Sequence, residues 1–214
     1  MAGWETIWSA NGGLQPGQFF DALKPLPALV SLLQRNAESS FLGTNVLVPG
    51  CGRGYAPIEF AKFGFNAVGL DISPTAVQSA QSYYSGLKNE PNLSISFQQG
   101  SFFDVEKDSY DVGYDYTFFC ALEPEMREDW STSWSNLLKE NGILITAIFP
   151  IVPGKIGGPP FAVTLAMYKK HLEPKGFQLL EEPNTLTNEQ AHEGRGDGKT
   201  VLAIWKKSTT KSEL

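Results

Sequence analysis

The sequence predicts an α/β fold: a doubly wound, mostly parallel seven-stranded sheet with helices on both faces, preceded by an N-terminal helical extension. From about residue 45 onward, short apolar runs alternate with helical patterns, which is typical of repeated βα units around a parallel sheet. The chain has 214 residues and a hydrophobic content of 42%, enough for one ordinary domain with a sizeable core. We therefore expect a single domain over residues 1–214, in which residues 1–40 form the extension.

Each expected element follows from a local pattern. The strand segments are 45–48, 67–70, 93–97, 110–118, 143–149, 177–181 and 201–205. Helical patterns cover 27–33, 55–62, 73–87, 124–139 and 164–172, and the polar stretch 183–199 is expected to be a long loop. Ser73 followed by Pro74 is a typical helix start. Asn141-Gly142 is expected to end a helix just before the fifth strand.

Composition excludes several classes of protein. Lys plus Arg number 17 against 23 Asp plus Glu, so the net charge of −6 argues against a generally basic nucleic-acid binder. No apolar run reaches the ~18 residues of a membrane span, and the N-terminus lacks a secretory pattern. The two cysteines give no sign of an oxidising compartment, so we expect a cytoplasmic protein. The two histidines lack metal-ligand spacing, and no metal site is expected.

A glycine-rich turn follows the first strand. Gly50, Gly52 and Gly54 stand at alternate positions between a strand and a helix, where glycine lets the backbone approach a ligand closely. Asp71 ends the second strand, where a carboxylate can accept hydrogen bonds from a ribose diol. A tight turn with a helix-flanking acid is the structural alternative, but this order of elements favours nucleotide binding. The spacing G-x-G-x-G differs from the G-x-G-x-x-G of NAD-dependent dehydrogenases and recurs in enzymes that bind S-adenosylmethionine.

Five segments carry a more specific resemblance: LVPGCGRGY (47–55), VGLDIS (68–73), DYTFFCALEPEMR (115–127), ITAIFP (145–150) and GGPPF (157–161). In these segments the chain resembles class I S-adenosylmethionine-dependent methyltransferases of the thiopurine S-methyltransferase family. Within that family it is similar to plant and fungal thiol/halide methyltransferases. The resemblance implies a Rossmann-like fold and S-adenosylmethionine as the cofactor, which leaves as S-adenosylhomocysteine.

The resemblance also implies a cofactor site. Its residues would be Trp4 and Trp8 as a lid, Gly50, Gly52 and Gly54 around the methionine portion, Asp71 at the ribose, Ser101 and Phe102 beside the adenine, and Asp115. A hydrophobic anchor for the N-terminus is the structural alternative for the tryptophan pair. Relatives often carry a third Trp in a Pro-Trp-Asp segment. Here residues 16–21 read Pro-Gly-Gln-Phe-Phe-Asp, which leaves Phe19 and Phe20 as alternative replacements.

The acceptor is expected at the carboxyl ends of the strands, where ligands of doubly wound sheets bind. The residues placed around the reacting centre are Asp115, Tyr116, Phe118, Phe149, Pro150, Pro159 and Phe161. Tyr116 is the expected orienting group, and Asp115 is expected to assist deprotonation or cofactor placement. Arg195 resembles a family residue that faces an anionic acceptor, with a solvated loop position as the alternative. Strand alternation implies that at least one of Phe118 and Phe119 belongs to the core.

The expected function is direct in-line methyl transfer to a small thiol, or to halide, bisulfide or thiocyanate. A free thiol has a pKa near ~8.5, so a dedicated base is optional. Residues 115–118 read Asp-Tyr-Thr-Phe in place of the Asn-Pro-Pro-aromatic motif of nucleic-acid amino-group methyltransferases, so no nucleic-acid partner is expected. The alternatives are a non-catalytic S-adenosylmethionine-binding module and an NAD-type oxidoreductase. The sequence leaves the acceptor open, thiopurines included, and the compact design predicts a monomer.

Overall fold

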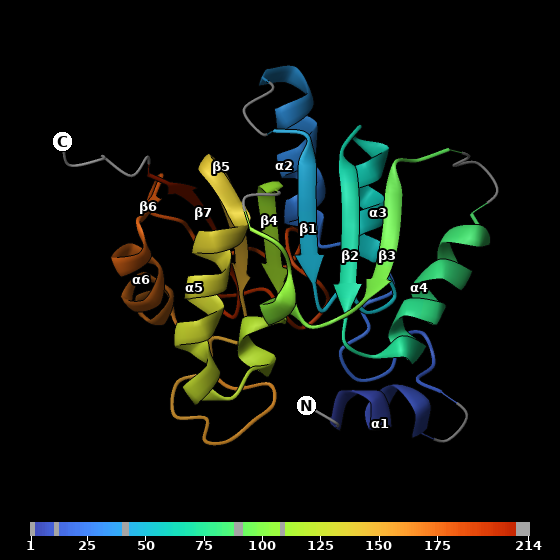
Figure 1. Ribbon diagram of the computed structural model, residues 1–214. Helices are drawn as coiled ribbons and strands as arrows, with labels where there is room; N and C mark the ends of the chain where they lie inside the picture. The colour runs from blue at the N-terminus through green and yellow to red at the C-terminus, as the bar shows by residue number, and fades with distance from the viewer. Residues whose placement is uncertain (1–2, 11–12, 40–42, 88–91, 108–109, 209–214) are drawn as a thin grey trace. The chain divides into compact units, whose positions relative to one another are not determined.

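A computed structural model describes residues 3–10, 13–39, 43–87, 92–107 and 110–208. The chain forms two compact units, Met1–Val105 and Glu106–Leu214, which run from blue to green and from green to red in Figure 1. Each unit is described by itself. The expectation of one domain over the whole chain stays a prediction.

The first unit contains three parallel strands. They are β1 (Asn45–Pro49), β2 (Asn66–Asp71) and β3 (Ile95–Gln99), with β2 between the other two. Its helices are α1 (Gly3–Ser9), α2 (Pro27–Ser39), α3 (Tyr55–Lys62) and α4 (Pro74–Ser85), and a 3₁₀ turn, η2, covers Phe102–Asp104. Figure 1 shows α1 beyond the arrowheads of β2 and β3, so the N-terminal extension lies at the carboxyl ends of these strands.

The second unit contains four strands in the order β4-β5-β7-β6. β4 (Tyr110–Tyr116) is parallel to β5 (Leu138–Ile148), whereas β7 (Val201–Lys207) is antiparallel to both β5 and β6 (Phe177–Leu179). Its helices are α5 (Arg127–Leu137) and α6 (Leu165–Leu172), with 3₁₀ turns η3 (Phe119–Ala121), η4 (Pro124–Met126) and η5 (Glu173–Lys175). Large aromatic side chains fill its core, among them the fully buried Trp130, Trp134 and Trp205.

Local sequence signals explain where several helices begin. The Ser73 hydroxyl accepts a hydrogen bond from the Ala76 N–H at 3.0 Å, with Pro74 in the first turn of α4, as the sequence predicted. Thr164 caps α6 in the same way through the N–H of Met167. Helix α3 has the predicted bounds.

The predicted start of the fifth strand is wrong. α5 ends at Leu137 and β5 begins at Leu138, before the Asn141-Gly142 pair that was expected to separate helix from strand. Asn141 has φ 62°, and the pairing register shifts between Tyr110 and Val112, so the pair forms an irregularity within the strand. A turn signal of this kind therefore marked a bulge in the strand.

Within the part of the chain that the structure describes, no helix is long and apolar enough to cross a membrane.

Candidate active site

The glycine turn after β1 requires glycine at each of its three positions. Gly50, Gly52 and Gly54 have φ values of 58°, 53° and 82°, a left-handed conformation that disfavours other residues. A Cβ atom on Gly54 would lie 2.6 Å from the Phe97 ring, and one on Gly52 would lie 3.2 Å from Cζ2 of Trp8. Conformation and close approach thus account for the G-x-G-x-G pattern.

Asp71 is bound directly to this turn. Its Oδ2 accepts a hydrogen bond from the Gly52 N–H, and its Oδ1 accepts one from the Ser73 N–H, both at 3.0 Å. Burial raises the pKa of the carboxyl group, against the lowering effect of these N–H donors. An ionised carboxylate offers about four acceptor positions, and these two bonds leave room for a ribose diol. The predicted ribose-binding residue and the glycine turn therefore fit S-adenosylmethionine.

An aromatic cluster covers the turn. The Phe20 ring lies 5.7 Å, between centroids, from each of the Trp4 and Trp8 rings. Trp8 is buried over Gly52, whereas Phe19 is 84% exposed. Of the two candidate replacements for the family's third tryptophan, Phe20 is the one that packs with the tryptophan pair.

Ser101 and Phe102 follow β3 next to Asp71. The N–H of Gly100 donates to the Asp71 carbonyl at 3.0 Å, which fixes the end of β3 beside β2. Ser101 caps η2 by accepting from the Phe103 N–H at 3.2 Å, and Phe102 is buried. Both residues predicted for the adenine therefore follow the carboxyl end of β3, the strand that pairs with β2, and β2 ends at Asp71.

In the second unit, Asp115 is buried at the end of β4. Its Oδ2 accepts from the Trp130 Nε1–H at 2.8 Å and its Oδ1 from the Phe119 N–H at 3.2 Å, and its exposed fraction is 0%. Burial raises the pKa of this carboxyl group to about 6. Thr117 has φ 62°, an unusual conformation for a β-branched residue. Asp115 therefore anchors the strained turn, and its catalytic or cofactor-placing role stays a prediction.

Tyr116, Phe149 and Arg195 lie together. Arg195 donates from Nη1 to the Tyr116 hydroxyl oxygen at 2.9 Å, and its guanidinium carbon lies 5.0 Å from the Phe149 ring centroid. Burial raises the pKa of Tyr116, and Arg195 opposes that rise. His192, which the sequence reasoning did not single out, stacks on the Tyr116 ring at 5.7 Å between centroids. Arg195 is therefore part of an aromatic cluster, not only of a polar loop.

Arg127 is the main residue that the sequence reasoning missed. Its side chain is buried, with the guanidinium carbon 4.8 Å from the Phe119 ring centroid and 5.8 Å from that of Phe161. Nη1 reaches the sulfur of Met167 at 3.9 Å, but Nε and Nη2 are buried without a hydrogen-bond partner among the described residues. Burial lowers the pKa of the guanidinium. Buried charges are normally paired, so two unpaired nitrogens on a buried guanidinium are an unusual feature of this cluster.

The other residues predicted around the acceptor differ in burial. Phe119 is fully buried and Phe118 is half-buried, so Phe119 is the core member of that pair. Phe161 packs on Arg127 and donates its N–H to the Cys120 carbonyl at 2.7 Å. Pro150 is buried after β5, whereas Pro159 is exposed. Both cysteines, Cys51 and Cys120, are free thiols.

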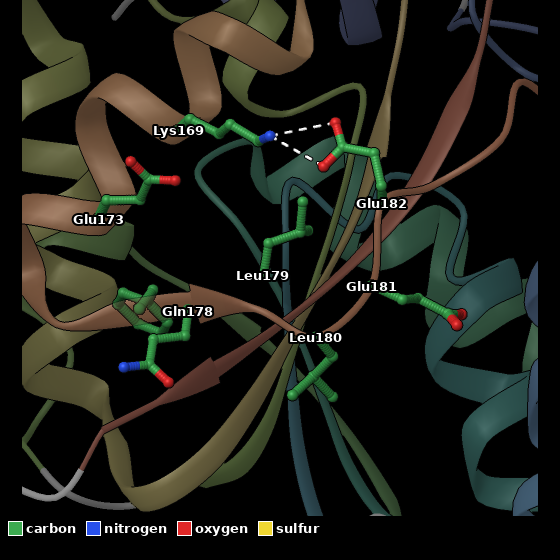
Figure 2. A pocket seen from close by; sticks show the side chains of 8 residues that line it. Lys169, Glu173, Gln178, Leu179, Leu180, Glu181 and Glu182 are labelled. Carbon is green, nitrogen blue, oxygen red and sulfur yellow. Dashed lines mark hydrogen bonds and ion pairs between the residues drawn. The ribbon is translucent and has the colours of Figure 1, made fainter.

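A surface pocket elsewhere in the second unit contains none of the predicted site residues (Figure 2). The Lys169 ammonium and the Glu182 carboxylate form an ion pair at 2.9 Å on its rim. The residues lining the pocket are Lys169, Glu173, Phe177, Gln178, Leu179, Leu180, Glu181 and Glu182. Among the described residues, no group of three or more His, Cys, Asp or Glu side chains could hold a metal ion.

Comparison with known sequences identifies the family. The family model described as thiopurine S-methyltransferase (TPMT) matches residues 1–208. "Probable thiol methyltransferase 2" of Arabidopsis thaliana is 38% identical over 97% of this chain and 86% of that protein. "Thiocyanate methyltransferase 1" of Brassica oleracea is 35% identical over 96% of this chain and 84% of its own length. "Thiopurine S-methyltransferase" of Pseudomonas paraeruginosa is 30% identical over 78% and 79% of the two chains.

Solved structures agree on the fold. The structure described as "Conversion of a Disulfide Bond into a Thioacetal Group during Echinomycin Biosynthesis" aligns with this chain with a TM-score of 0.74. It covers 99% of this chain and 94% of that chain, at 16% identity. Magnesium protoporphyrin IX methyltransferase from Synechocystis PCC 6803, solved with S-adenosylhomocysteine, aligns with a TM-score of 0.68 over 96% and 93% of the chains, at 18% identity.

The predicted fold class, seven mostly parallel strands in a Rossmann-like α/β arrangement, is confirmed by these alignments. The predicted cofactor, S-adenosylmethionine, and the predicted enzyme class are confirmed by the family, which excludes the NAD-type alternative. The chain belongs to the thiopurine S-methyltransferase family of S-adenosylmethionine-dependent methyltransferases.

Proposed function

We propose that this enzyme transfers a methyl group to a small acceptor bound as an anion: a thiolate, bisulfide, thiocyanate or a halide. The buried Arg127, with two nitrogens that lack partners among the described residues, is the observation that carries this proposal. The names of the plant relatives, a thiol and a thiocyanate methyltransferase, support it because both acceptors are small and sulfur-based.

The aromatic surroundings of Arg127 suit a small, weakly hydrated anion. Phe119 and Phe161 flank the guanidinium, so an acceptor there would exchange water for apolar surroundings and two N–H donors. An anion in this position would also supply the missing charge partner. A neutral acceptor would leave the buried cation uncompensated.

The hydroxyl of Tyr116 adds a directed donor. A guanidinium only donates hydrogen bonds, so in the 2.9 Å contact with Arg195 the tyrosine oxygen is the acceptor. The tyrosine proton must then point elsewhere, and no described residue is seen to accept it. We propose that this proton is offered to the acceptor anion, and that Tyr116 orients the acceptor in this way.

On the cofactor side, the proposed ligands are the glycine turn, Asp71 at the ribose, Ser101 and Phe102 at the adenine, and the cluster of Trp4, Trp8 and Phe20 as cover. S-adenosylmethionine supplies a methyl group on a sulfonium centre. The residues of the chain then have to position the acceptor behind that methyl group and exclude water. The aromatic side chains Phe149 and Phe161 favour positive charge near their faces.

No general base is needed for this reaction. A thiol with a pKa near ~8.5 is partly ionised at neutral pH, and halides and thiocyanate are already anions. Asp115 has both oxygens engaged by Trp130 and Phe119, so we propose that it holds the turn that carries Tyr116.

The test is methyl transfer by wild type and an Arg127→Met variant to bisulfide, thiocyanate, iodide, an aromatic thiol, a thiopurine and a catechol. Methionine keeps much of the buried volume and removes the unpaired charge, so the variant should fold at least as well. We expect kcat/KM for the anions to fall roughly 10- to 100-fold, as for the loss of a charged hydrogen bond. Arg35→Met, on the exposed side of α2, is the control and should leave kcat/KM unchanged.

Two outcomes would contradict the proposal. Equal kcat/KM values for wild type and Arg127→Met would contradict an anion-binding site at Arg127. Binding of S-adenosylmethionine without turnover of any acceptor on the panel would favour the non-catalytic binding module.

A further inference from the structure

We infer that Glu5 and Arg53 are positioning residues that couple closure of the N-terminal cap to cofactor binding. The N-terminal cap is defined as residues 3–10 and 13–24, which include α1. The inference rests on the proposed cofactor site around the glycine turn and Asp71.

Glu5 ties α1 to the turn that holds Asp71. Its Oε1 accepts from the Thr75 hydroxyl at 2.6 Å, and its Oε2 accepts from the Ser73 hydroxyl at 2.5 Å and the Thr75 N–H at 3.3 Å. These hydrogen bonds lower the pKa of Glu5, so the carboxylate is ionised at neutral pH. Ser73 is fully buried, and its own N–H donates to Asp71. Glu5 and Asp71 therefore share one short segment.

Arg53 ties the second part of the cap to the glycine turn. It stands between Gly52 and Gly54, donates from Nε to Asp21 at 2.8 Å, and donates from Nη2 to the Leu14 carbonyl at 2.7 Å. The exposed side-chain fractions of Arg53 and Asp21 are only 11% and 2%. A buried pair of this kind is costly to break, because the remaining charge stays buried without a partner.

The cap depends on these contacts. α1 has seven residues, too few for a stable isolated helix, so its position is set by its anchors. One anchor adjoins Asp71, the other adjoins Gly52, and the Trp8 ring lies on Gly52. A cofactor that orders the glycine turn and Asp71 therefore also stabilises the closed cap. By linkage, the factor by which the bound cofactor favours the closed cap is also the factor by which closure of the cap raises the affinity for the cofactor.

The test uses binding of S-adenosylhomocysteine, measured by calorimetry on the full chain, together with hydrogen–deuterium exchange of residues 3–9. In Glu5→Ala we expect the Kd to rise roughly 5- to 20-fold, as for charge-assisted hydrogen bonds at a partly exposed site. Protection of residues 3–9 by the ligand should be lost, while kcat at saturating S-adenosylmethionine stays within about twofold. Glu5→Gln keeps an acceptor oxygen and should partly restore the affinity.

Ser9→Ala is the matched control. The Ser9 hydroxyl bonds only within α1, to the Glu5 carbonyl, so its loss should leave the Kd and the protection unchanged. Thr75→Val removes one of the three hydrogen bonds that Glu5 accepts, so it should give part of the Glu5→Ala effect and should add nothing to it in the double variant. Arg53→Gln should also raise the Kd for S-adenosylhomocysteine.

An unchanged Kd and unchanged protection in Glu5→Ala would overturn the inference and leave the proposed function standing. Failure of wild type to bind S-adenosylhomocysteine would instead overturn the cofactor site on which both depend. A fall in the melting temperature alone, with intact ligand protection, would assign Glu5 a purely structural role and would also overturn the inference.

Discussion

The buried carboxyl group of Asp115 predicts a pH dependence of stability with a defined sign. Its pKa in the folded protein is about 6, because burial disfavours the charged form, against an ordinary value of ~3.9 in the unfolded chain. The folded state thus holds the proton more tightly. The stabilisation from Asp115 is fully present below the unfolded pKa and is lost as the pH rises through about 6. At roughly 1.4 kcal/mol per pKa unit, the loss amounts to about 3 kcal/mol.

Asp115→Asn isolates this effect, because asparagine does not titrate. The amide cannot satisfy both the Trp130 Nε1–H and the Phe119 N–H, so the variant carries a constant cost of ~1–3 kcal/mol at every pH. The free energy of unfolding of wild type minus that of the variant should fall by roughly 2 kcal/mol between pH 4 and pH 7, because about half of the unfolded chains have already lost this proton at pH 4.

Urea unfolding, followed by tryptophan fluorescence at pH 4, 5, 6 and 7, measures this difference directly. Asp104→Asn, which removes a carboxylate from an exposed position, is the control for general charge effects. A wild-type-minus-variant difference that stays constant with pH, or one that grows with pH, would refute the burial argument.

Two glycine substitutions test close packing. Gly52→Ala places a Cβ atom 3.2 Å from Trp8 in a left-handed position and should weaken S-adenosylhomocysteine binding roughly tenfold. Gly64 has φ 87°, and a Cβ atom there would have nothing within 4 Å, so calorimetry on Gly64→Ala should show a stability loss of ~1–2 kcal/mol and wild-type affinity. An equal loss of affinity in Gly52→Ala and Gly64→Ala would contradict a role of the Trp8–Gly52 contact in cofactor binding. Gly113→Ala places a Cβ atom 2.4 Å from the buried Trp134 ring, and urea unfolding should show a loss of ~1–3 kcal/mol or more; an unchanged midpoint would contradict the packing.

The parts of the fold that the sequence predicted well are those with local causes. The cap at Ser73-Pro74 and the bounds of α3 depend on residues within one helical turn of each other. The start of β5 was mispredicted because the Asn141-Gly142 signal is compatible with a helix stop and with a strand irregularity alike. Pairing with β4 decides between them, and that contact lies about 30 residues away in sequence.

The same distinction applies to the candidate site. The glycine turn and Asp71 follow from spacing along two consecutive strands, and the structure brings them to 3.0 Å. The role of Asp115, in β4, depends on Trp130 from helix α5, and the missing partners of Arg127 depend on how several distant segments pack around it. No pattern within the sequence encodes such an absence, although Arg127 closes one of the segments that carry the family resemblance.

The pH dependence of kcat/KM for two acceptors tests whether the enzyme methylates its acceptor as a bound anion. For an aromatic thiol, kcat/KM should rise with pH and level off above the solution pKa of that thiol, because only the thiolate is bound. For thiocyanate, which is an anion throughout, the profile should lack this rise. A rise of the same shape for both acceptors would show that a group on the enzyme must lose a proton, and would contradict a requirement for ionisation of the acceptor alone.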